Sequence, residues 1–92
     1  MKDNHPLEDY SLVIDPDVKP DNHIVVYNDD VNTFDFVIES LINVCKHERL
    51  QAEQCTYIIH YNGRCTVKGG DYTKLRPICE ALTDRGLSAI IE

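Results

Sequence analysis

The segment IVVYNDDVNTFDFV, residues 24–37, carries the strongest structural signal in this chain. A short β-branched run ends at Asn28-Asp29-Asp30, and an amphipathic helical pattern begins a few residues later. We therefore expect two carboxylates and an amide at a strand-to-helix corner, beside aromatic and aliphatic side chains. Such a corner suits a cation that carries an apolar body. Taken alone, the segment favours a solvated loop of Asx-turns that starts the helix.

Strand and helix patterns alternate along the rest of the chain. Asn32 is a good N-cap, which predicts a helix from Thr33 whose apolar residues recur at i, i+3, i+4 and i+7. Asn62-Gly63 is typical of a helix end. Pro77 favours a start of the last helix near Thr73, because an interior proline costs roughly 3 kcal/mol. The predicted order is strand, helix, helix, strand, helix, strand, at residues 23–27, 33–47, 48–61, 64–68, 73–84 and 87–91.

The length and composition indicate one small globular domain. A chain of 92 residues with 42% hydrophobic residues buries a core one layer thick, so we expect a two-layer α/β (α+β) domain. Residues 1–22 contain three of the four prolines and many aspartates, which predicts a flexible acidic arm before a folded domain over residues 23–92.

The net charge of the chain favours some classes of partner over others. Nine basic and sixteen acidic residues give a formal charge of −7, which disfavours nucleic acid and acidic membrane surfaces and favours basic peptides or amino groups. No apolar run is long enough to span a bilayer, and the first residues lack the apolar core of a secretion signal. We therefore expect a cytoplasmic protein. The four cysteines form no C-x-x-C pair, and we expect neither a metal nor a cofactor.

A histidine near the end of the second predicted helix is the other candidate site residue. His60 and Thr56 are four residues apart, so both lie along one side of the Cys55 and Ile59 stripe and are able to face one cavity. The alternative is an exposed histidine that interacts favourably with the helix dipole. Only convergence with the corner at residues 28–30 would favour a binding role.

The corner motif and this helix end together resemble the ClpS family. The motif N-D-D is followed by F-x-F-V at residues 34–37, and the second helix ends in I-H-Y-N-G at residues 59–63. ClpS proteins are adaptors that hand substrates with destabilising amino-terminal residues to the Clp AAA+ protease. The resemblance covers about residues 24–92 and implies a small domain in which three antiparallel strands carry helices, as in the carboxyl-terminal domain of the ribosomal stalk protein.

The resemblance also implies a set of site residues and partners. Asn28, Asp30 and His60 would hold the free α-amino group of a substrate, and Asp29 would add negative potential. An ammonium group has three donors, which a carboxylate and two neutral acceptors satisfy. His60 must be neutral to accept a hydrogen bond, so binding should weaken as pH falls through roughly 6.5. The expected partners are N-degron substrates and the amino-terminal domain of a Clp-family AAA+ ATPase, with the adaptor a monomer and not an enzyme. The family's pocket-wall positions fall on Val26, Tyr27, Asn32, Phe34, Val37, Thr56, Ile59 and Leu87.

This chain departs from the common family pattern at the pocket. Asn32-Thr33-Phe34 stands where the family commonly has Thr-Pro-Met, and Thr56 stands at a position that is commonly Met. The preference among Leu, Phe, Tyr and Trp as first residues therefore stays open. Two alternative functions also stay open: a protein-interaction domain that is indifferent to free amino termini, and a metal-dependent enzyme that uses the Asp and His side chains.

Overall fold

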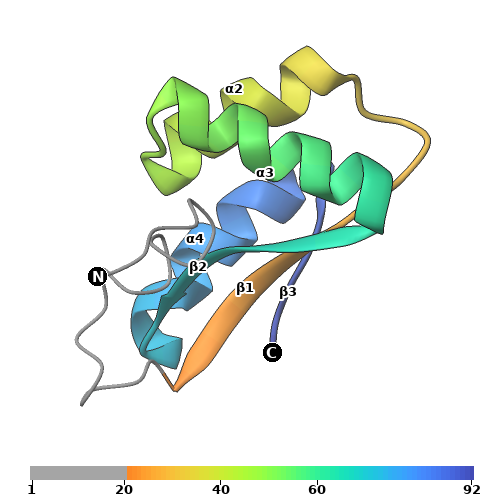
Figure 1. Ribbon diagram of the computed structural model, residues 1–92. Coiled ribbons are helices and arrows are strands. Elements are labelled where there is room, and N and C mark those ends of the chain that lie inside the picture. The colour runs from red at the N-terminus through yellow and green to blue at the C-terminus, as the bar shows by residue number, and fades with distance from the viewer. Residues whose placement is uncertain (1–20) are drawn as a thin grey trace, which may run out of the picture.

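The computed structural model describes residues 21–92, so the predicted acidic arm lies almost entirely outside the described residues (Figure 1). The predicted order of elements is confirmed, with boundaries that differ by one or two residues. The elements are β1 (Asn22–Tyr27), α2 (Phe34–Cys45), α3 (Arg49–Asn62), β2 (Arg64–Gly70), α4 (Tyr72–Asp84) and β3 (Ser88–Ile91).

The three strands form one antiparallel sheet in the order β2-β1-β3. The first strand is therefore central, and Val26 pairs with Cys65 on one side and with Ala89 on the other. Figure 1 shows the helices α2, α3 and α4 gathered on one side of this sheet. The result is the expected two-layer α+β fold, which the antiparallel pairing and the helical layer confirm.

The core lies between the sheet and the three helices. Ile24 and Val26 point inward from β1, because alternate residues of a strand face the same side. Their β-branched side chains fit a half-buried strand. The other buried members of this core are Ile38, Leu41, Cys45, Ala52, Cys55, Ile59, Val67, Leu75, Cys79, Leu82, Leu87 and Ala89.

The other face of the sheet carries a polar network. The Tyr27 hydroxyl donates a hydrogen bond to a carboxylate oxygen of Glu92 and accepts one from Arg64 Nη1 at 3.2 Å. Arg64 Nη1 also lies 3.8 Å from Glu92 Oε1. These groups join the three neighbouring chain segments across the sheet, but exposed ion pairs contribute little to stability.

The amino-terminal end of α2 is capped one residue later than the sequence predicted. Thr33 is the N-cap, and its Oγ1 accepts a hydrogen bond from the Phe36 backbone N–H at 3.1 Å. Asn32 precedes the cap, and its side-chain amide is hydrogen-bonded within the preceding loop and to Gly86. The tertiary bonds of Asn32 therefore replaced the capping role that the local pattern favoured.

The carboxyl-terminal end of α2 turns sharply into the core. Lys46 has left-handed backbone angles, with φ of 64°, and the next backbone N–H, of His47, donates to the Leu41 carbonyl at 3.3 Å. The sequence placed His47 at the helix end, and the structure buries its side chain to 6% exposure. Its Nε2–H donates to the Val67 carbonyl at 2.8 Å, which fastens this turn to β2.

Pro77 lies farther inside α4 than the sequence predicted. The helix begins at Tyr72, so the proline is beyond the first turn. Proline has no N–H to donate to the carbonyl of Thr73, four residues earlier. Both residues are exposed, so water is able to hydrate this carbonyl.

Candidate functional site

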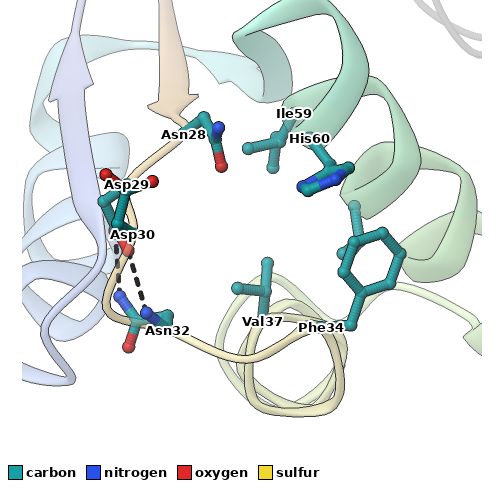
Figure 2. A pocket seen from close by; sticks show the side chains of 9 residues that line it. Asn28, Asp29, Asp30, Asn32, Phe34, Val37, Ile59 and His60 are labelled. Carbon is teal, nitrogen blue, oxygen red and sulfur yellow. Dashed lines mark hydrogen bonds between the residues drawn. The ribbon is translucent and has the colours of Figure 1, made fainter.

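A pocket of about 260 Å³ opens where the end of β1, the start of α2 and the last turns of α3 meet (Figure 2). The structure brings together in its lining all four residues predicted for amino-group binding and five of the eight predicted for the wall. The lining residues are Asn28, Asp29, Asp30, Asn32, Phe34, Val37, Thr56, Ile59 and His60.

Asp29 organises the loop that forms one side of the pocket. Its Oδ1 accepts hydrogen bonds from the backbone N–H groups of Val31 and Asn32, each at 2.9 Å. Its Oδ2 accepts another from Asn32 Nδ2 at 2.9 Å, drawn as part of the network in Figure 2. Asn32 Nδ2 also donates to the Gly86 carbonyl at 2.9 Å. Asp29 thus forms the Asx-type turn that the sequence suggested for this loop.

These hydrogen bonds change the acidity of Asp29. Burial raises the pKa of the Asp29 carboxyl, but hydrogen bonds from the Asn32 and Val31 backbones and from the Asn32 and Ser88 side chains outweigh it. The pKa of Asp29 is therefore lowered from its ordinary value, because the bonds favour the charged form. Asp29 contributes a negative charge to the pocket while its oxygens hold the loop.

Asn28 and Asp30 differ from Asp29 because their side chains are exposed and make no hydrogen bond to another residue of 21–92. The Asn28 backbone N–H donates to the Gly63 carbonyl at 2.8 Å. This bond fastens the end of β1 to the end of α3, which places Asn28 near His60 at the pocket rim (Figure 2). Both side chains are available to a ligand.

His60 lies on the rim opposite the aspartates (Figure 2). Its ring is held by edge contacts with Phe34, at 5.1 Å between ring centroids, and with Tyr61, at 4.8 Å. The imidazole makes no hydrogen bond to the described part of the chain. The structure thus meets the condition that the sequence set for a binding role, because His60 and the corner residues line one pocket.

The apolar wall of the pocket comes from the two helices that face each other. Phe34 and Val37 extend from α2, and Ile59 and Thr56 extend from α3. Thr56 is 2% exposed, and its Oγ1 donates to the Ala52 carbonyl at 2.7 Å within α3. The threonine hydroxyl is therefore satisfied without a ligand, so this wall offers mainly carbon atoms.

Three residues that the resemblance placed in the wall lie elsewhere. Val26 and Leu87 are 1% and 4% exposed and belong to the core. Tyr27 takes part in the polar network on the other face of the sheet, because strand neighbours point to opposite faces.

Two tyrosines beside the pocket were not predicted from the sequence. Tyr57 contacts the Phe34 ring edge-on at 5.2 Å, and Tyr61 contacts His60. The two tyrosines are four residues apart on α3, which is the only signal that the linear sequence offered for a shared surface.

No group of three His, Cys, Asp or Glu side chains in residues 21–92 is arranged to hold a metal ion. None of the helices described in this range is long and apolar enough to cross a membrane.

Comparisons with known proteins agree with the resemblance seen in the motifs. The sequence model of the family described as ATP-dependent Clp protease adaptor protein ClpS matches residues 18–89. Proteins named ATP-dependent Clp protease adapter protein ClpS from Campylobacter jejuni strains 81-176 and RM1221 are each 45% identical to the chain over 40 residues. That alignment covers 44% of this chain and 42% of each relative, so it spans less than half the length of either protein.

Proposed function

This chain belongs to the ClpS family of ATP-dependent Clp protease adaptor proteins, and we propose that it binds polypeptides by a free, bulky hydrophobic amino-terminal residue. It then delivers them to a Clp AAA+ unfoldase for degradation. The observation that carries the proposal is one pocket that combines unpaired polar groups with an apolar wall.

The polar side of the pocket suits a protonated α-amino group. Asp30 supplies a carboxylate, and Asn28 and a neutral His60 supply neutral acceptors, so the three donors of an ammonium group each find a partner. Asp29 is ionised more readily than an ordinary aspartate, which adds to the negative potential. Acylation of the amino group removes its charge and two of its donors, so an acetylated peptide should bind poorly.

The apolar side of the pocket suits the first side chain. Phe34, Val37 and Ile59 line it, and a bound side chain that leaves water gains roughly 25 cal/mol per Å² of apolar surface buried. A peptide that begins with Phe or Leu therefore has both a charge and an apolar surface to satisfy. A free amino terminus on a small polar residue has only the first of these.

The test is fluorescence anisotropy of dye-labelled peptides that begin with Phe, Leu, Tyr or Trp, each measured beside its N-acetylated twin. The proposal predicts binding that acetylation abolishes, and the ranking shows how Phe34 and Thr56 shape the pocket. Equal binding of the free and acetylated peptides would favour the interaction-domain alternative. A reaction that depends on added divalent cations would favour the enzyme.

Delivery needs a separate test, because capture and hand-over use different surfaces. A peptide-tagged fluorescent protein with Phe as its first residue should be degraded by a reconstituted Clp ATPase and protease only when this chain is added. Competition by a short free Phe peptide, but not by its acetylated twin, would connect degradation to the pocket.

A further inference from the structure

Two exposed tyrosines on α3 have no role in the proposed function. Tyr57 and Tyr61 are 54% and 72% exposed. Their rings stack with planes 7° apart and centroids 6.0 Å apart, because residues at i and i+4 lie on one face of a helix. Tyrosine is enriched in binding surfaces, since its rigid ring presents a large area at low entropic cost.

The tyrosines continue the wall of the pocket without a break. Tyr57 contacts Phe34 edge-on at 5.2 Å, and Tyr61 contacts His60 edge-on at 4.8 Å. Phe34 and His60 line the pocket and contact each other at 5.1 Å. We call the rings of Phe34, Tyr57 and Tyr61 the aromatic shelf. The shelf therefore begins inside the pocket at Phe34 and extends past the rim at His60, which Tyr61 contacts.

The dimensions of the shelf fit a short length of extended chain. An extended polypeptide advances about 3.3–3.6 Å per residue. The centroid of the Tyr61 ring is 4.8 Å from that of His60, and the centroid of the Tyr57 ring is 6.0 Å from that of Tyr61. One or two residues of extended chain span these distances, which puts the shelf within reach of the residues that follow the first one.

The tyrosine faces of the shelf and the net charge of the chain favour a cation. Elsewhere in the described chain, Arg64 lies over the Tyr27 ring and Arg85 over the Phe36 ring, each at 5.9 Å. No arginine or lysine of residues 21–92 occupies the faces of Tyr57 and Tyr61 in this way. The chain carries a formal charge of −7, so an incoming basic side chain is also attracted at longer range.

We propose that the aromatic shelf is a second binding site, which takes an Arg or Lys side chain at the second or third residue of a polypeptide whose amino terminus occupies the pocket. The proposal rests on the proposed function. It deepens that function because it makes recognition depend on the residues that follow the first one.

The test compares free peptides that begin Phe-Arg, Phe-Ala and Phe-Glu and are otherwise identical, with N-acetylated twins, by anisotropy on the full chain. Phe-Arg should bind about threefold more tightly than Phe-Ala, as expected for an exposed cation–π contact, and Phe-Glu should bind more weakly than either. In Tyr57→Ala/Tyr61→Ala the ratio of the Phe-Arg to the Phe-Ala dissociation constant should approach one, while Phe-Ala still binds in its free form.

Matched variants separate the ring contact from charge and from folding. Tyr72→Ala removes a tyrosine of similar exposure, 53%, from α4 and should leave the ratio unchanged. Tyr57→Phe/Tyr61→Phe keeps both rings and should keep the preference even if the alanine variant folds poorly.

The outcomes distinguish the two proposals. Acetylation-sensitive binding that ignores the second and third residues, or a preference that survives removal of both rings, would overturn the shelf and leave the proposed function standing. Failure of every free peptide to bind would overturn both.

Discussion

The two ends of α2 both carry polar side chains next to the core, but they use them in opposite ways. At the carboxyl-terminal end, His47 is buried and donates to the Val67 carbonyl, so its polar ring is part of the packed interior. At the amino-terminal end, Asp29 and Asn32 hold the loop, while Asp30 lines the pocket and remains exposed.

The difference shows where a small domain is able to leave polar side chains without a partner in the protein. A buried polar group without a partner costs about 1–3 kcal/mol, so the polar groups at the His47 end have to form hydrogen bonds within the protein. Water reaches Asn28 and Asp30, so these side chains need no partner within the protein and cost the fold little stability. We call the amino-terminal end of α2, with its preceding loop, the open end, and the His47 end the closed end. The loop at the open end is ordered by Asp29, whose carboxylate accepts hydrogen bonds from the loop backbone.

The largest effect that we expect is on binding, at the open end. Asp30→Ala removes the carboxylate proposed to pair with the amino group, and truncation of one partner of a charge pair that the bound peptide buries costs about 2–5 kcal/mol, or at least about 30-fold in Kd. The free energy of unfolding should change by less than about 0.5 kcal/mol, as for other surface substitutions. Anisotropy with a free Phe peptide and urea unfolding measure the two quantities.

Asp35→Ala is the matched control, because Asp35 is an exposed carboxylate on the first turn of α2 that does not line the pocket. Its Kd should stay within about twofold of the unmodified chain, since only net charge has changed. Equal losses in the two variants would mean that net charge, and not the Asp30 position, controls binding.

At the closed end the expected effect is on stability. His47→Ala leaves a cavity and removes the hydrogen bond to the Val67 carbonyl, which should lower the free energy of unfolding by roughly 2–3 kcal/mol. The Kd for the Phe peptide should not change while the protein is folded. His60→Ala should behave in the reverse way, with binding lost and stability kept. If both histidine variants lost stability alone, the two ends would not differ as described.

Asp29 belongs to the open end but should behave partly like the closed one. Asp29→Ala removes three hydrogen bonds to Val31 and Asn32, and we expect a loss of about 1–2 kcal/mol in unfolding free energy. The Kd should rise less than in Asp30→Ala, because the loop loosens but the proposed amino-group partner stays. An Asp29 variant with the stability of the unmodified chain would contradict this division of roles.

The smallest effect concerns pH and again comes from the closed end. Burial lowers the pKa of His47 below its ordinary value of 6.5, and nearby Lys68 also lowers it, although the bond to Val67 raises it. The unfolded state therefore takes up the proton more readily than the folded state. The contribution of His47 to stability is complete above about pH 6.5, and it is lost as pH falls through the pKa that His47 has in the folded state.

Urea unfolding between pH 7.5 and pH 5 measures this dependence. One such group contributes a slope of at most about 1.4 kcal/mol per pH unit, and His47→Gln should show a shallower slope than the unmodified chain. Identical slopes would mean that His47 is not a source of the pH dependence.

The order of the elements was predictable because it depends on local patterns. The β-branched run of β1 and the i, i+4 spacing on α2 are properties of neighbouring residues, and the structure confirms both elements. The N-cap was misplaced by one residue because Asn32 bonds to Gly86, 54 positions away, and no local pattern reports such a contact.

The lining of the pocket was predictable in part, but its hydrogen bonds were not. The motif gave both Asp29 and Asp30, yet only the folded chain shows that one is hydrogen-bonded to Asn32 and the other is exposed. The burial of His47 and of Ser40, which accepts a hydrogen bond from Arg85 Nη1 at 3.0 Å, also depends on distant segments. Periodicity does not report such pairings.

The central position of β1 also has a consequence for synthesis on the ribosome. This strand emerges before the other two, yet one of its edges is paired by β3, with Tyr27 opposite Ser88. The loop that borders the pocket is likewise tied to Gly86, just before β3. A nascent chain must therefore keep one edge of the apolar strand β1 unpaired until β3 has left the exit tunnel, and the loop beside the pocket gains its bond to Gly86 only shortly before that.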